Sequence, residues 1–292
     1  EDMEKALKAD FVTVEEYVYD EEDLNVVPVA SVNGIKFYTL EEAVAYAQNG
    51  DTVKLLADVT EAAAVVLDKA ITLDGNGKKL TSTAGRAINI ETTGEVKISN
   101  LTVDAAERAF NVMNQPANVT LTGVTATADN NAVMLATSAA GANLTVNGCD
   151  FTGLAVINVA SAGSVVQITN TKITNVDANA AENYGAITVW STAENASVTV
   201  SGGEIIVADD SKKAYNFAEG ATITGVDEIG SIVAMIGDAG FETLSGAIKE
   251  AAAGETIKLV ADITASEIIT INKGITLDGN GKTLTSTAGR AI

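Results

Sequence analysis

The sequence has 292 residues, of which 47% are hydrophobic and 4% aromatic, and its formal net charge is −21. This hydrophobic content excludes a chain that is disordered throughout. The strong negative charge opposes binding to nucleic acid or to an anionic membrane, and no stretch is apolar for long enough to span a bilayer. The sequence has no His, which removes the commonest general base, and a single Cys, Cys149, cannot form an internal disulfide.

The chain begins with an acidic arm, residues 1–30, in which the stretch FVTVEEYVYD alternates as a strand does. We expect this arm to be a linker or an added edge strand. It is followed by TLEEAVAYAQNG, whose apolar residues recur at helical spacing and predict a helix near residues 39–49. Thr39 and Glu42 have the capping-box pattern, and Gly50 suits the C-terminal end. Because the end of a solenoid must be covered, this helix should be a lid on the first coil, with packing on the flank as the alternative.

A short pattern then recurs along the chain, apolar-x-apolar-x-Gly/Asn. It ends at Gly75, Asn100, Gly123, Gly148, Asn170, Gly202 and Gly225, at spacings of 22 to 32 residues. A strand of the form Ala-apolar-x-apolar precedes each copy, and a third short strand follows. Gly and Asn tolerate positive φ, so the chain should turn at these positions. Three short strands per period predict an all-β solenoid, a right-handed parallel β-helix with about seven coils and an N-terminal capping helix.

The same pattern predicts the core. The residues one and three positions after each turn should point inward: Leu101, Val103, Val124, Ala126, Cys149, Phe151, Thr171 and Ile173. This places Cys149 in the core as a small buried hydrophobe rather than a reactive thiol.

A longer repeat divides the chain into units. The stretch ITLDGNGKKLTSTAGRAI, which begins at Ile71, returns 204 residues later from Ile275 with one change. The chain should therefore hold one β-helix unit, residues 31–230, and a truncated second unit, residues 231–292. The second unit begins with a cap helix near residues 243–253, in which Gly246 stands where the first helix has Glu42, so its capping box is lost. Ile292 falls inside a predicted strand, so we expect that it is not a natural end.

The coil pattern, together with VNGIKFYTLEEAVAYAQNGDTVKLLADV and the ITLDGNGKKL that follows, resembles the parallel β-helix repeats of the pectate-lyase-like superfamily, especially those of large bacterial cell-surface proteins. The resemblance covers about residues 32–292. It implies an extracellular location on a bacterial surface. Many members have no known catalysis. Lyases and hydrolases of this fold use outward carboxylates on adjacent coils, with Ca²⁺ and an Arg or Lys base, or with a pair of acids.

Residues of that kind do occur. Asp150, Lys172 and Glu204 share one outward position on successive coils, and Asp104 lies two coils from Asp150. We favour a surface salt-bridge ladder over a catalytic group. The lyase arginine arrangement cannot be carried over, because arginines are few and Arg86 and Arg290 are equivalent turn positions.

The sequence DGNG at Asp74 superficially resembles a Ca²⁺ loop, but it lacks the further acidic ligands that such loops need. A tight turn through Asn76 and Gly77 is the favoured interpretation. We therefore predict no metal site and no cofactor, with Ca²⁺ as the one option left open.

The best candidate for ligand binding is the longest coil. Trp190, the only Trp, ends the strand AITVW, in which alternation should turn Thr188 and Trp190 outward, and the adjoining loop contributes Tyr184. An exposed aromatic beside a polar loop is typical of a sugar-stacking site. The alternative is that the loop folds over Trp190 and buries it.

A column of outward threonines raises a further option, ice binding, although Lys97 and Gln167 interrupt it. Its members are Thr72, Thr120, Thr145, Thr199 and Thr222. We expect a non-catalytic bacterial cell-surface repeat protein that acts as an adhesin, stalk or glycan-binding module. A polysaccharide lyase or glycoside hydrolase is the alternative, and ice binding a minor one. The expected partner is a glycan or another cell-surface polymer, with end-to-end self-association as an option.

Overall fold

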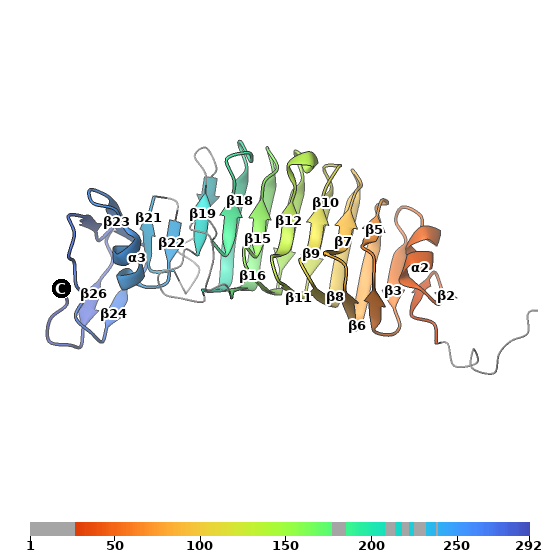
Figure 1. Ribbon diagram of the computed structural model, residues 1–292, viewed down its shortest axis with the longest axis horizontal. Coiled ribbons are helices and arrows are strands. Elements are labelled where there is room, and N and C mark those ends of the chain that lie inside the picture. The colour runs from red at the N-terminus through yellow and green to blue at the C-terminus, as the bar shows by residue number, and fades with distance from the viewer. Residues whose placement is uncertain (1–26, 177–184, 208–213, 218–221, 225–231, 238) are drawn as a thin grey trace, which may run out of the picture.

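The computed structural model describes residues 27–176, 185–207, 214–217, 222–224, 232–237 and 239–292. The chain forms a β-solenoid of about nine turns, whose parallel coils stack along one long axis (Figure 1). The predicted all-β solenoid is therefore confirmed. Most of the acidic arm and Tyr184 lie outside the described residues. Within them, no helix has the length and apolar character needed to cross a bilayer.

Sheet A holds the first two strands of each coil. In three coils these strands are separate: β3 (Thr52–Leu55) and β4 (Val59–Glu61), β10 (Asn118–Thr122) and β11 (Thr125–Ala128), β13 (Asn143–Asn147) and β14 (Asp150–Gly153). Elsewhere the two join into one bent strand: β6 (Thr72–Ser82), β8 (Glu95–Ala105), β16 (Val165–Asn175) and β18 (Ser197–Ile206). Strand β20 (Thr222–Thr224) continues the sheet.

Sheet B supplies the third strand of each coil. Its seven strands are all parallel and run in chain order along the solenoid. They are β5 (Val65–Leu67), β7 (Arg86–Ile90), β9 (Arg108–Val112), β12 (Asn131–Leu135), β15 (Ile157–Val159), β17 (Ile187–Val189) and β19 (Tyr215–Phe217). A short 3-10 helix, Thr137–Ala139, connects two coils. Each of the seven coils from β3 to β19 thus has the three short strands that the period predicted.

The Gly/Asn column makes the bend in sheet A. Asn100, Gly123, Gly148, Asn170 and Gly202 all have φ between +48° and +63°, as expected for turn positions. In the second coil the positive φ falls instead on Asn76 and Gly77. Gly75 has another role, because a Cβ there would lie 2.5 Å from the Leu101 Cα of the next coil. Its missing side chain lets the two backbones approach.

The predicted inward columns form the core. All eight side chains predicted to point inward are at most 4% exposed. Tyr215, Phe110 and Phe151 are the largest of the fully buried side chains in the first unit. Burial raises the pKa of the Cys149 thiol, whose Sγ contacts the backbone oxygens of Leu121 and Asn147. The prediction that Cys149 is a small buried residue of the core is confirmed.

A cap module precedes the first coil, and we use this name for a β-hairpin followed by a helix. The hairpin joins β1 (Ala30–Val32) to β2 (Ile35–Phe37), and β1 pairs antiparallel with β3, so the hairpin extends sheet A. Helix α2 (Leu40–Tyr46) lies against β5 of sheet B. Its capping box between Thr39 and Glu42 is present, but the helix ends before Gly50. The lid is therefore the hairpin and the helix together.

The second unit repeats this arrangement. Its cap module has β21 (Ala234–Ile236), β22 (Ala239–Phe241) and α3 (Leu244–Glu250). The strands β23 (Thr256–Leu259), β24 (Ile263–Ala265), β25 (Thr276–Asp278) and β26 (Leu284–Ser286) follow. Thr243 still caps α3 by accepting a hydrogen bond from the Gly246 N–H at 2.9 Å, and the second half of the box is absent, as predicted.

Candidate functional site

Trp190 follows β17 at a corner of the solenoid and is half-buried. Its indole Nε1 donates a hydrogen bond to Asn158 Oδ1 at 2.6 Å, and its backbone N–H donates to the Val159 carbonyl at 2.9 Å. The indole is thus attached by its N–H to the outer face of the preceding coil. An indole held in this way has little conformational freedom to lose on binding, and the residue as a whole is partly exposed.

The expected exposure of Thr188 is wrong, because the side chain is 0% exposed. Its hydroxyl accepts from the Gly185 N–H at 3.0 Å and donates to the Gly185 carbonyl at 3.1 Å. Strand alternation fixes the direction of a side chain but not what covers it, and here the hydroxyl is bonded to the backbone of Gly185. Tyr184, the third residue of the predicted site, lies outside the described residues.

Asn158, the partner of Trp190, belongs to a mostly polar column that runs along sheet B, in which Asn111, Asn158 and Thr188 are buried. Register places one residue from each strand in this column: Val66, Asn89, Asn111, Met134, Asn158, Thr188 and Asn216. The Asn111 amide donates to Asn89 Oδ1 at 3.3 Å. In the part of the chain that the structure describes, Asn111 Oδ1 and Arg108 Nε are buried without a hydrogen-bond partner. These two atoms are polar groups with unused hydrogen-bonding capacity, on strand β9 of the same sheet that carries Asn158.

Two of the three arginines of the chain flank this column. Arg86 and Arg108 are paired in register at the start of β7 and β9. Arg86 Nη1 lies 3.4 Å from Met113 Sδ, and Arg108 Nη2 lies 3.4 Å from Glu107 Oε1. We name the column with Arg86, Arg108 and Trp190 the sheet B face. Its partly exposed members are Asn89, Asn216, Arg86, Arg108 and Trp190, whose amides, guanidinium groups and indole can hydrogen-bond hydroxyls and stack on apolar rings.

The residues of the acid–base column are aligned, but their charges are not paired with one another. Asp150, Lys172 and Glu204 are neighbours in register, and all three are exposed. Within the described residues, no ion pair of 4.0 Å or less joins Lys172 to either acid, so the predicted salt-bridge ladder is wrong in that respect. The column is a row of separately solvated charges, which is the usual state of exposed side chains. Asp104 lies in a different row and pairs with Lys79 at 2.8 Å.

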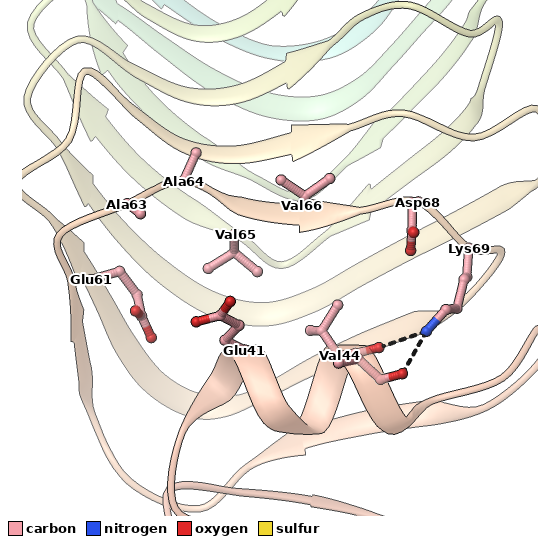
Figure 2. Close-up of a pocket in the computed structure, with 10 residues that line it drawn as sticks. Glu41, Val44, Glu61, Ala63, Ala64, Val65, Val66, Asp68 and Lys69 are labelled. Carbon is pink, nitrogen blue, oxygen red and sulfur yellow. Dashed lines mark hydrogen bonds between the residues drawn. The ribbon is translucent and has the colours of Figure 1, made fainter.

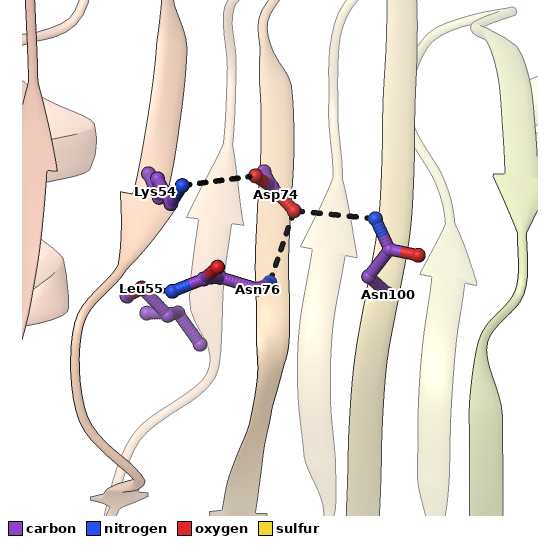
Figure 3. Close-up of polar contacts among 5 residues, drawn as sticks. All are labelled: Lys54, Leu55, Asp74, Asn76 and Asn100. Atoms are coloured by element: carbon purple, nitrogen blue, oxygen red, sulfur yellow. Dashed lines mark hydrogen bonds and ion pairs between the residues drawn. The ribbon is translucent and has the colours of Figure 1, made fainter.

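The DGNG sequence forms the tight turn that was predicted. Asp74 Oδ1 accepts from the Asn76 N–H at 2.9 Å and from Asn100 Nδ2 at 3.4 Å, and Lys54 Nζ lies 4.0 Å from Asp74 Oδ2 (Figure 3). Asn76 Nδ2 donates to the Leu55 carbonyl at 3.1 Å. The carboxylate thus holds the turn and links three coils. Among the described residues, no three Asp, Glu, Cys or His side chains gather in a way that could hold a metal ion.

The threonine column is interrupted by charge and by a change of register. Thr72, Lys97, Thr120, Thr145, Gln167 and Thr199 do share one row. Thr199 then pairs with Thr224, so the expected place of Thr222 in this row is wrong by two residues. A regular threonine surface therefore does not extend over the solenoid.

A groove that the sequence did not predict lies between the cap helix and the first coil. It has a volume of about 360 Å³ and is lined by α2 and by the corner that joins β4 to β5 (Figure 2). Val44 and Val65 contribute apolar surface, and Glu41 and Glu61 contribute carboxylates. Burial and the charge of Glu41 raise the pKa of Glu61. Lys69 closes the end of the helix by donating to the carbonyls of Val44 and Ala45 at 3.2 and 2.7 Å.

The second cap module has a groove of about 390 Å³ at the equivalent place. Ser245 and Ala265 stand there at the positions of Glu41 and Glu61. The groove itself therefore comes with the cap architecture, whereas the acidic pair belongs to the first unit. Aligning the two units of this chain could have identified Glu41 and Glu61, because both acids are replaced in the second unit.

Comparisons with protein-family models, curated proteins and solved structures find no match for this chain.

Proposed function

We propose that this chain is a non-catalytic, glycan-binding repeat module of a bacterial cell-surface protein, related to the pectate-lyase-like β-helix proteins that its coil pattern resembles. The observation that carries the proposal is the sheet B face, where Trp190 is fixed by its N–H to Asn158, in a column that also holds Asn89, Asn111 and Asn216. Sugars bind to proteins through an aromatic ring under their apolar face and amide groups on their hydroxyls.

Three further observations support this proposal over catalysis. The acid–base column lies on an exposed face and its charges are not paired with each other. Asp104 is in another row and is paired with Lys79. The chain also starts a second unit with the same cap and the same first coil, which suits an extended array that displays binding surfaces.

A glycan array tests the proposal, with wild-type protein beside Trp190→Ala and Tyr46→Ala. Tyr46 is also exposed but lies on the cap helix, so it controls for loss of any surface aromatic. We expect a glycan signal that falls about tenfold in Trp190→Ala, because a stacked aromatic contributes about 1 kcal/mol or more. It should be unchanged in Tyr46→Ala.

The same preparation separates binding from cleavage. Incubation with acidic polysaccharides and added Ca²⁺ should release no shorter products, and protease treatment of intact source cells should remove the protein. No glycan signal, equal binding by Trp190→Ala, or polysaccharide cleavage would each contradict the proposal.

A further inference from the structure

The junction between the two units is a direct stack of β22 on β19 (Figure 1). The Ala214 N–H donates to the Gly240 carbonyl at 2.6 Å. Next to this bond, Tyr215 is 0% exposed, and its ring lies against Gly240. A Cβ at Gly240 would be 2.5 Å from Tyr215 Cδ2 and 3.2 Å from Ile232 Cγ2. The tyrosine ring therefore occupies the space that a side chain at position 240 would need.

A second contact crosses the junction beside the first. Glu242 Oε1 accepts a hydrogen bond from the Val207 N–H at 3.1 Å. Val207 follows β18 of the first unit, and Glu242 follows β22 of the second. The hairpin of the second cap module is thus held to the first unit by a backbone bond, by a packed tyrosine and by a carboxylate.

The first cap module has the same hairpin with different side chains at these places. Ala30 pairs with Phe37 as Ala234 pairs with Phe241, so the backbone registers are equal. Lys36, however, stands at the position of Gly240, and Tyr38 at that of Glu242. Both are exposed, and β2 is the outermost strand of sheet A.

We propose that the end of the first unit selects its neighbour through Tyr215, accepting a cap module with glycine at position 240 and rejecting one with lysine there. The two cap modules of this chain are therefore not interchangeable, and the order of units is set by residue-level fit at the junction. Lys36 has the complementary role: it keeps β2 from stacking on a coil that ends as β19 does, with a buried tyrosine, since lysine on an edge strand opposes strand addition. This inference depends on the tandem arrangement and not on glycan binding.

The test is hydrogen exchange on the full chain, following the Ala214 amide and the amides of β21 and β22. We expect Gly240→Lys to lower their protection about ten- to hundredfold, because the added side chain cannot share the space of the ring. Ser245→Lys is the matched control, since it places the same charge on an exposed position of the same cap module, and it should leave protection unchanged. Lys36→Gly should also have no effect at this junction.

The double variant Gly240→Lys with Tyr215→Ala distinguishes selection by Tyr215 from a general intolerance of β22. Removing the ring should restore most of the protection that Gly240→Lys loses. If Gly240→Lys does not fold, hydrogen exchange is compared instead between Gly240→Ala and the double variant Gly240→Ala with Tyr215→Ala. Full protection in the single variant, or no recovery in the double variant, would overturn the proposal without affecting the glycan-binding assay.

Discussion

The most informative single perturbation is Gly75→Ala, because the chain contains its own control at Gly279. Both glycines occupy the same DGNG turn, and neither has φ in the left-handed region. At Gly75 a Cβ would lie 2.5 Å from the Asn100 carbonyl oxygen and from Leu101 Cα, whereas at Gly279 the nearest atom would be 3.9 Å away. The difference exists because β8 stacks on β6, while β25 is the outermost strand of its sheet.

The magnitude follows from this geometry. Carbon atoms pack at about 3.5–4.0 Å, so the added methyl needs roughly 1 Å of separation that only a movement of backbone can provide. Overpacking of this kind costs about 1–3 kcal/mol, and a rigid backbone partner places Gly75→Ala near 3 kcal/mol. Gly279→Ala has room and should be neutral or stabilising by about 0.4–1 kcal/mol, since it restricts the unfolded chain.

Urea unfolding followed by Trp190 fluorescence gives the free energy of unfolding of the first unit, and hydrogen exchange in β8 locates the effect. We expect Gly75→Ala to reduce both, and Gly279→Ala to change neither measurably. Equal effects of the two substitutions, or a loss below about 0.5 kcal/mol for Gly75→Ala, would show that the coils do not stack as closely as described.

Three other outcomes are expected. Thr39→Ala should destabilise α2 by about 1 kcal/mol. Thr243→Ala should destabilise α3 by less, because the capping box of α3 is incomplete. Hydrogen exchange of the first-turn amides measures both losses, and equal losses would contradict this expectation. Burial raises the pKa of Glu242 to about 7, so the folded junction binds more protons than the unfolded chain, and its stability should fall as pH rises from about 4.5 to 7. In Glu242→Gln that decline should disappear from pH-dependent melting, and an unchanged slope would refute the assignment. Cys149 should react with a thiol reagent only as fast as the solenoid opens, so prompt labelling in native buffer would contradict its burial.

Much of the fold could be predicted because it depends on local periodicity. The Gly/Asn positions marked the bends, and the residues after them marked the core, since each coil repeats the same geometry. The hairpin β1–β2 was missed although its turn, Asn33–Gly34, has φ of +50° and +84° and is the commonest two-residue hairpin sequence. The coil period describes parallel strands, and this antiparallel hairpin does not follow that period.

The site was harder to predict because it depends on contacts between coils and loops. Alternation predicts Thr188 outside, but the side chain is buried and its hydroxyl is bonded to the backbone of Gly185. The residues of the sheet B column occupy the x position of the Ala-apolar-x-apolar pattern, as Asn89 does in AINI. Its link to Trp190 through Asn158 spans 32 residues and requires the register of two strands.

The central claim is that the second unit continues the solenoid of the first, and a distance between the two cap helices tests it most directly. Spin labels at Tyr46→Cys and Glu250→Cys occupy equivalent exposed positions, and the native Cys149 is buried. Nine spacings separate the first coil of each unit: six along sheet B from β5 to β19, one from β19 to β22, and two more through β21 to β23. At roughly 4.8 Å each they predict a separation on the order of 45 Å. A narrow distribution near that value supports the account. A distribution that is broad, or centred below about 30 Å as for a second unit folded back on the flank, would contradict it.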